Sequence, residues 1–78
     1  MKIEIITPDV KLFEGEVSSV MLPGFLGSFQ ILNHHAPIIS SLTSGSICVS
    51  RDDREDKIFQ INGGVVEMQN NTIVILAD

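Results

Sequence analysis

Short runs of alternating apolar and polar residues recur along the chain, with turn residues between them. Strand-like runs are expected at residues 2–7, 10–13, 16–22, 27–32, 37–42, 46–51, 57–62, 65–69 and 72–77. Alternation with a period of two is typical of half-buried strands, and apolar residues at helical spacing do not extend beyond a turn or two. Short strands with turns every 8–12 residues or so indicate a β-sandwich or barrel. The pattern therefore predicts an all-β fold, a small β-sandwich of about ten short, mostly antiparallel strands.

Turn-forming residues indicate where these strands end. Gly15 can adopt the positive φ of a tight turn, so Glu14-Gly15 is expected to join two strands of a hairpin. Asn70-Asn71 is a second turn pair, because asparagine tolerates the left-handed region. Gly63-Gly64 predicts a tight bend or bulge at a strand start. The charged residues at 52–56 predict a solvated hairpin tip.

Residues 23–37 do not resemble a simple connection between strands. The stretch holds two glycines, a histidine pair followed by Ala-Pro, and the large apolar residues Phe25, Phe29 and Ile31. Most hairpin connections need only about 2–5 residues. The stretch therefore predicts contact with another molecule, unless these three side chains fold back into the core.

Length and composition limit the organisation of the protein. The 78 residues are expected to form one domain, residues 1–78, with no room for a second core. A domain of this size buries only about 60% of the surface that its unfolded chain exposes, so it is marginally stable alone. Hydrophobic residues make up 44% of the chain, which indicates an ordinary globular core and excludes a disordered tail.

Charge and cysteine content exclude several classes of protein. Five basic and ten acidic residues give a net charge of −5, and an acidic chain without a basic run lacks the phosphate contacts needed to bind nucleic acid. Attraction to an anionic membrane surface is disfavoured for the same reason. Cys48 is alone, so it forms no disulfide framework and is expected to be a small buried side chain. No leader signature and no membrane-spanning apolar run is present, so a reducing, cytosol-like compartment is expected.

The candidate chemistry does not assemble into an active site. His34 and His35 would point to opposite faces of a strand and have no acid in the same segment, so no metal site is predicted. Glu14 and Glu16 are expected at a solvated turn, whereas general acid–base catalysis needs a carboxylate in a dry pocket. The chain has no Gly-x-Ser-x-Gly motif, and no lysine follows Gly63-Gly64. We therefore expect no catalytic residue and no cofactor.

Two non-enzymatic classes remain open from the residues alone. A biotinyl or lipoyl carrier domain is a β-sandwich of similar size, but it needs a modifiable lysine at a hairpin tip. The segment most similar to a carrier motif, Val66-Glu67-Met68-Gln69, has no lysine. Lys57 flanks a charged loop and has no small apolar neighbours. The other class is an interaction module that docks through the apolar stretch.

Four motifs follow one another along the chain. They are Gly27-x-Phe29-x-Ile31-x-x-x-His35-Ala36-Pro37, Leu42-x-x-Gly45, Phe59-x-Ile61-x-Gly63-Gly64-x-Val66-Glu67 and Ile73-x-Ile75-Leu76-Ala77. In this order and spacing they resemble the epsilon subunit of F-type ATP synthases. The resemblance runs from Lys2 to Asp78, and its structural motif positions include Gly27, Pro37, Gly63, Gly64 and Glu67.

The resemblance implies a subunit of the rotary central stalk of a proton-translocating synthase. In that family an N-terminal β-sandwich packs on the gamma subunit and its lower end sits on polar loops of the c-ring. The alpha and beta subunits belong to the same complex. The domain turns with the ring and carries out no bond chemistry. The implied location is the cytoplasmic face of a bacterial inner membrane, as a peripheral subunit without insertion into the bilayer.

The resemblance also assigns roles to single residues. Ser28, Gln30 and His35 are implied to face the c-ring, and Thr7 and Ser40 are implied to lie near gamma. The family pattern is Gly-Glu-Leu-Gly-Ile, followed by a glycine before His-Ala-Pro. Here Ser28 replaces the Glu, Phe29 the Leu, Gln30 the second Gly and His34 the last Gly. Without the Glu, contact with the ring would depend on hydrogen bonds and shape.

The family usually continues into a two-helix C-terminal domain that can inhibit ATP hydrolysis and, in some members, binds ATP. This sequence ends at Asp78, where that domain would begin. The resemblance therefore implies a coupling subunit with no C-terminal helical hairpin and neither of those two properties.

Overall fold

The computed structural model describes residues 1–78, and all of its regular elements are strands. They are β1 (Lys2–Ile6), β2 (Lys11–Glu16), β3 (Ser19–Gly24), β4 (Gly27–Leu32), β5 (Ile38–Leu42), β6 (Gly45–Arg51), β7 (Arg54–Ile61), β8 (Gly64–Gln69) and β9 (Thr72–Ala77). The all-β prediction is confirmed, with nine strands. No helix in the structure is long and apolar enough to span a membrane.

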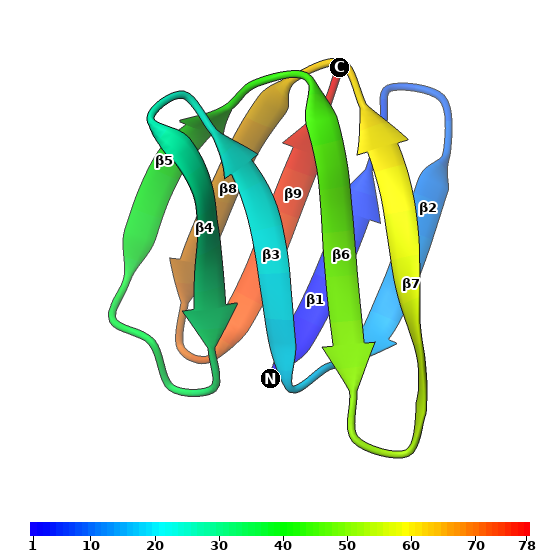
Figure 1. Ribbon diagram of the computed structural model, residues 1–78, viewed down its shortest axis with the longest axis vertical. Coiled ribbons are helices and arrows are strands. Elements are labelled where there is room, and N and C mark those ends of the chain that lie inside the picture. Colours follow the sequence, from blue (N-terminus) through cyan, green and yellow to red (C-terminus); the bar gives the residue numbers. More distant parts are fainter.

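The nine strands form one curled sheet that folds onto itself in two layers. Its order is β2-β1-β9-β8-β5-β3-β6-β7, with β4 paired to the side of β3. Strands β1 and β9 are parallel, and the other pairs are antiparallel. In Figure 1, β3, β4, β6 and β7 lie in front of β1, β8 and β9. The sheet turns the corner between β3 and β5, where Gly24 and Leu42 are the single bridging pair.

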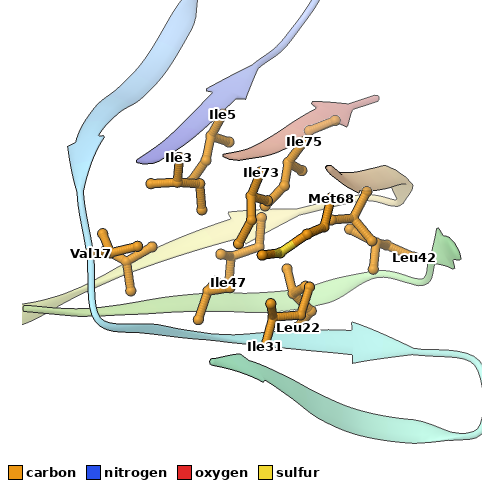
Figure 2. Packing of buried hydrophobic residues seen from close by; sticks show 14 of the residues in the cluster. Ile3, Ile5, Val17, Leu22, Ile31, Leu42, Ile47, Met68, Ile73 and Ile75 are labelled. Atoms are coloured by element: carbon orange, nitrogen blue, oxygen red, sulfur yellow. The ribbon is translucent and has the colours of Figure 1, made fainter. Parts of the chain in front are cut away.

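The core lies between the two layers and is entirely apolar. It contains 16 buried residues, and no polar or charged residue is buried. Figure 2 shows Ile3, Ile5, Ile73, Ile75 and Met68 facing Leu22, Ile31 and Ile47 from the other layer. Each such side chain contributes about 1.5–3 kcal/mol through burial. Alternating strand residues supply this core, as the sequence pattern predicts.

One predicted turn is wrong. Strand β2 runs straight through Glu14-Gly15, with Gly15 opposite Ile3 of β1. Gly15 does not have a positive φ, so its conformational freedom is not used for a turn. The chain changes layers at residues 17–18 instead, where the buried side chain of Val17 anchors the crossing.

Other predicted turns are confirmed. Asn70 and Asn71 have φ values of 52° and 56°, in the left-handed region that asparagine tolerates. Gly63 and Gly64 have φ values of 136° and 151°, and a Cβ on Gly64 would overlap the carbonyl oxygen of Leu76. The charged tip is shorter than expected, because β7 already begins at Arg54.

Cys48 is not fully buried, contrary to expectation. It is half-buried on the outward face of β6, because its neighbours Ile47 and Val49 occupy the inward positions. Its Sγ lies 3.8 Å from a carboxylate oxygen of Asp56. Burial raises the pKa of the Cys48 thiol, and the charge of Asp56 raises it further.

Candidate functional site

Residues 23–37 are not one loop. They comprise the last two residues of β3, a two-residue turn at one end of the molecule, the edge strand β4, and a loop at the opposite end (Figure 1). The turn and the loop are thus separated by the length of β4. The apolar and histidine-containing parts of the stretch belong to different surfaces.

The turn between β3 and β4 exposes two large apolar side chains. Phe25 is 72% exposed and Leu26 is fully exposed. Gly24 and Gly27 pair on either side of them, and a Cβ on Gly24 would come within 2.8 Å of the Gly27 carbonyl oxygen. A tight glycine-flanked turn therefore holds both side chains out in solvent.

Strand β4 distributes its side chains between the core and the surface. Ile31 is completely buried and Phe29 packs partly buried against the core. Ser28 and Gln30 are exposed on the outward face. Of the three apolar residues that could fold back, only Ile31 is a full core residue.

The loop at residues 33–37 is fixed to the turn between β8 and β9. His34 has a φ of 65°, and its backbone N–H donates to Oδ1 of Asn71 at 2.7 Å. The same Asn71 donates from Nδ2 to Oδ1 of Asn33 at 3.0 Å. The left-handed conformation of His34 explains why the epsilon pattern has glycine at this position, since glycine adopts it without steric cost.

His35 is exposed on the same loop. Its backbone N–H donates to the Leu32 carbonyl at 3.1 Å, and its Nδ1 lies 2.7 Å from the Ala36 carbonyl oxygen. No group of three or more His, Cys, Asp or Glu side chains is arranged to hold a metal ion.

The residues assigned by the resemblance do not converge on one site. Ser28 and Gln30 share the outward face of β4, while His35 lies past the end of that strand. Thr7 closes a turn in which its Oγ1 donates to the Val10 carbonyl at 3.0 Å. Ser40 lines an open groove of about 570 Å³ beside the β3–β4 turn.

An exposed apolar patch is the feature that the sequence reading missed. It is formed by Ile39, Val65 and Leu76, which are 74%, 42% and 55% exposed. Their strands β5, β8 and β9 are neighbours, Val65 pairs directly with Leu76, and Ile39, which pairs with Glu67, is diagonal to Val65. The continuous apolar run at 73–77 is a signal of such a surface, because such runs are typical of strands covered on both faces.

The edge formed by β1 and β2 is charged. Nζ of Lys11 lies 2.8 Å from a Glu4 carboxylate oxygen and 3.2 Å from one of Glu14. Hydrogen bonds to Glu4 and Glu14 raise the pKa of Lys11, and the hydrogen bond from Lys11 lowers the pKa of Glu14. These groups lie in solvent on strands, so they stabilise an edge and form no dry catalytic pocket.

Phe13 bridges the gap between the two ends of the curled sheet. Its ring centroid lies 5.6 Å from that of Phe59 on β7. Arg51 Cζ and Lys57 Nζ lie 5.8 and 5.7 Å from the same centroid, within the range of cation–π attraction. Lys57 therefore packs on an aromatic ring within β7, which does not suit the exposed hairpin lysine of a carrier domain.

Comparison with known proteins shows to which family this chain belongs. A family model described as "ATP synthase, Delta/Epsilon chain, beta-sandwich domain" matches residues 1–78, and the chain belongs to this family. Its relatives narrow the assignment to the epsilon chain. The ATP synthase epsilon chain of Chlorobium limicola is 42% identical over 77 residues, which cover 99% of this chain and 88% of the relative. That of Dichelobacter nodosus is 35% identical over 77 residues, covering 99% of this chain and 54% of the relative.

Solved structures show the same fold at low sequence identity. A chain in the Euglena gracilis mitochondrial ATP synthase (OSCP/F1/c-ring) superimposes with a TM-score of 0.88 at 17% identity. The match covers 96% of this chain and 48% of that one. A chain in the central stalk and c-ring of the Tetrahymena thermophila mitochondrial enzyme gives 0.80 at 20% identity, covering 97% and 61%. The predicted family is confirmed, and this chain is a non-catalytic epsilon-type β-sandwich of the ATP synthase.

Proposed function

We propose that this protein packs on the gamma subunit of a proton-translocating F-type ATP synthase, contacts the c-ring, and couples rotation to ATP synthesis. It would act at the cytoplasmic face of a bacterial inner membrane, in one complex with the alpha and beta subunits. The observation that carries the proposal is the family match over residues 1–78 together with a surface suited to docking. The structure favours no carrier function, because Lys57 lies within β7 against Phe13.

The patch formed by Ile39, Val65 and Leu76 is the surface we assign to gamma. Three large apolar side chains gather on the outside of neighbouring strands in a small acidic protein. Contiguous exposed apolar side chains mark interaction sites, and burying them would contribute about 25 cal/mol for each Å² removed from water. Ser40 follows Ile39 in β5, but its side chain points to the opposite face of the strand, so Ser40 remains a separate position that the resemblance assigns to gamma.

Leu76→Glu tests the gamma contact. A carboxylate in the middle of an apolar interface would be desolvated without a partner, so assembly with gamma should weaken at least about tenfold. Thr72→Glu is the matched control, because Thr72 is also exposed on the outward face of β9, near its other end. Affinity would be measured by calorimetric titration of purified gamma with each variant. Equal affinity of the two variants would contradict the assignment.

Ser28, Gln30 and His35 are the positions we assign to the c-ring. All three are exposed, Ser28 and Gln30 on the edge strand β4 and His35 in the loop that follows it. Single cysteines at these positions, in a Cys48→Ser background, should cross-link to c-ring loop cysteines in the assembled synthase. A cysteine at Leu12, exposed on β2 at the other end of the strand order, is the control. Cross-linking from Leu12 with none from the three positions would reject the orientation.

Coupling is tested in the complex itself. Synthase reconstituted without this subunit should lose ATP-driven proton pumping, and adding the subunit back should restore it. Pumping that is unchanged without the subunit would contradict the coupling role.

A further inference from the structure

Three strands pair on one side only, and they differ in how that free side is protected. They are β2, β4 and β7. Unpaired strand edges attract other chains, and proteins usually protect them with charges, prolines or bulges. Strands β2 and β7 follow this rule: both carry lysine and glutamate, and the register shifts beside each of them.

Strand β4 has none of these protections. Its sequence, Gly-Ser-Phe-Gln-Ile-Leu, contains no charge and no proline, and its pairing with β3 is regular throughout. The surroundings are also uncharged, because residues 17–50 contain no Lys, Arg, Asp or Glu. All 15 charged residues, 5 basic plus 10 acidic, therefore lie outside this segment.

The hairpin geometry shows which backbone groups of β4 are free. Residues opposite one another in an antiparallel pair alternate between hydrogen-bonded and non-hydrogen-bonded pairs. The Pro23 carbonyl accepts from the Thr43 N–H at 2.9 Å, on the side of β3 away from β4. The Pro23–Ser28 pair is therefore not hydrogen-bonded. Because the two kinds of pair alternate, the Met21–Gln30 pair is not hydrogen-bonded either. The N–H and C=O groups of Ser28 and Gln30 thus point outward from the edge.

We propose that β4 pairs with β4 of a second copy of this chain, antiparallel about a two-fold axis at Gln30. In this register Gln30 exchanges both backbone hydrogen bonds with its own copy. Ser28 lies opposite Leu32, whose carbonyl already accepts from the His35 N–H, so the pairing is centred on Gln30. Each chain has a net charge of −5, so two copies repel least when their uncharged segments meet. The arrangement also brings the exposed Leu26 of one copy toward the loop after Leu32 of the other.

Self-pairing would occupy the edge that carries Ser28 and Gln30. If these residues face the c-ring, as proposed above, the paired form cannot contact the ring until the two copies separate. This consequence rests on the proposed function, whereas the pairing itself does not. The pairing is measured with the purified chain alone, so its failure would leave the stalk role untouched.

Sedimentation velocity of the purified protein, from micromolar to millimolar concentration, tests the pairing. The wild-type chain should form a reversible dimer. Gln30→Pro removes the outward N–H without breaking a β3–β4 hydrogen bond, and it should weaken dimerisation at least about tenfold. Gln30→Thr, which keeps the N–H, should dimerise like the wild type. A monomer at every concentration, or a dimer unaffected by Gln30→Pro, would overturn the proposal.

A charge pair tests the two-fold register without relying on proline. Gln30→Lys and Gln30→Glu should each be monomeric, because like charges then lie directly opposite one another. Mixing the two variants should restore a dimer containing one copy of each. Loss of the wild-type dimer through Leu76→Glu would instead place the contact on the patch and reject β4. Circular dichroism of every variant verifies that the sheet is intact.

Discussion

The two sides of the sandwich are stabilised by different interactions. On the side of β3, β4 and β5, the segment 17–50 has no charged residue, and stability comes from buried apolar side chains and from the hydrogen bonds of Asn71 to the 33–37 loop. On the side of β1, β2 and β7, Lys11 joins two carboxylates and Phe13 packs on Phe59. Figure 1 shows these sides at opposite edges of the molecule.

This difference separates surfaces available for contact from surfaces that are protected. Charges and bulges keep the β2 and β7 edges soluble, at little energetic benefit, since exposed ion pairs contribute only about 0–1 kcal/mol. The uncharged side leaves β4 and the β3–β4 turn exposed. Its stability should therefore respond strongly to packing and hydrogen bonding, and weakly to salt and pH.

The largest expected effect is in the core of the uncharged side. Ile31→Ala removes a fully buried side chain, so it should lower the free energy of unfolding by about 2–5 kcal/mol. Leu26→Ala lies five residues away on the same hairpin and is fully exposed, so it should change stability by less than about 0.5 kcal/mol. Urea denaturation of both variants measures the contrast. Equal losses would mean that the turn is packed in solution.

The fold could be predicted because alternation with a period of two decides which side chains face the core. The Glu14-Gly15 turn was mispredicted because Gly15 uses no positive φ and simply continues β2 opposite Ile3. Sequence alone does not show whether a glycine's freedom is used. Cys48 was mispredicted because it was judged by its apolar neighbours, which occupy the opposite face of β6.

The candidate site was less predictable than the fold. The chemical character of residues 23–37 was visible in the sequence, but their division between opposite ends of β4 depends on strand pairing. The patch of Ile39, Val65 and Leu76 is assembled from three strands, with the first residue 37 positions before the last (76 − 39). No local pattern brings these residues together.

Removing the side-chain amide of Asn71 should have the next largest effect on stability. Asn71→Gly keeps a residue that accepts the left-handed conformation but removes the side chain that bonds both Asn33 and His34. We expect a loss of about 1–2 kcal/mol, from two hydrogen bonds of modest net value. Asn70→Gly is the control, because Asn70 has a similar φ of 52° and no side-chain hydrogen bond. Thermal unfolding compares the two, and equal stability would mean that the loop is not held by Asn71.

Glycine substitutions at the adjacent residues His34 and His35 should change the stability of the protein in opposite directions. His34→Gly relieves a left-handed conformation and should stabilise the protein by about 0.5–1 kcal/mol, after the entropic cost of glycine. His35→Gly relieves nothing, since His35 has no positive φ, and should destabilise it by about 0.5 kcal/mol. Chemical denaturation measures both variants. A loss of stability in both would show that the His34 side chain makes stabilising contacts in solution.

The smallest expected effect on stability comes from the Lys11 ion pairs on the charged side, and it should depend on pH. The Lys11 hydrogen bond lowers the pKa of Glu14, so its stabilisation is present above the unfolded-state pKa, about 4.3, and is lost as pH falls through the lower folded value. Glu4 and Glu14 raise the pKa of Lys11, so the lysine contribution is lost only at alkaline pH. Lys11→Met should therefore be less stable than the wild type near neutrality, with the difference shrinking in acid and in high salt.

Arg54→Met is the matched control for this last change, because it removes one positive charge from a side chain that forms no ion pair in the structure. Its stability difference from the wild type should vary less between neutral and acid pH, as followed by circular dichroism. If both variants show the same pH dependence, the effect comes from net charge and the Lys11 ion pairs do not stabilise this edge. The two sides would then differ in charge but not in how they are held together, because burial would account for the stability of both.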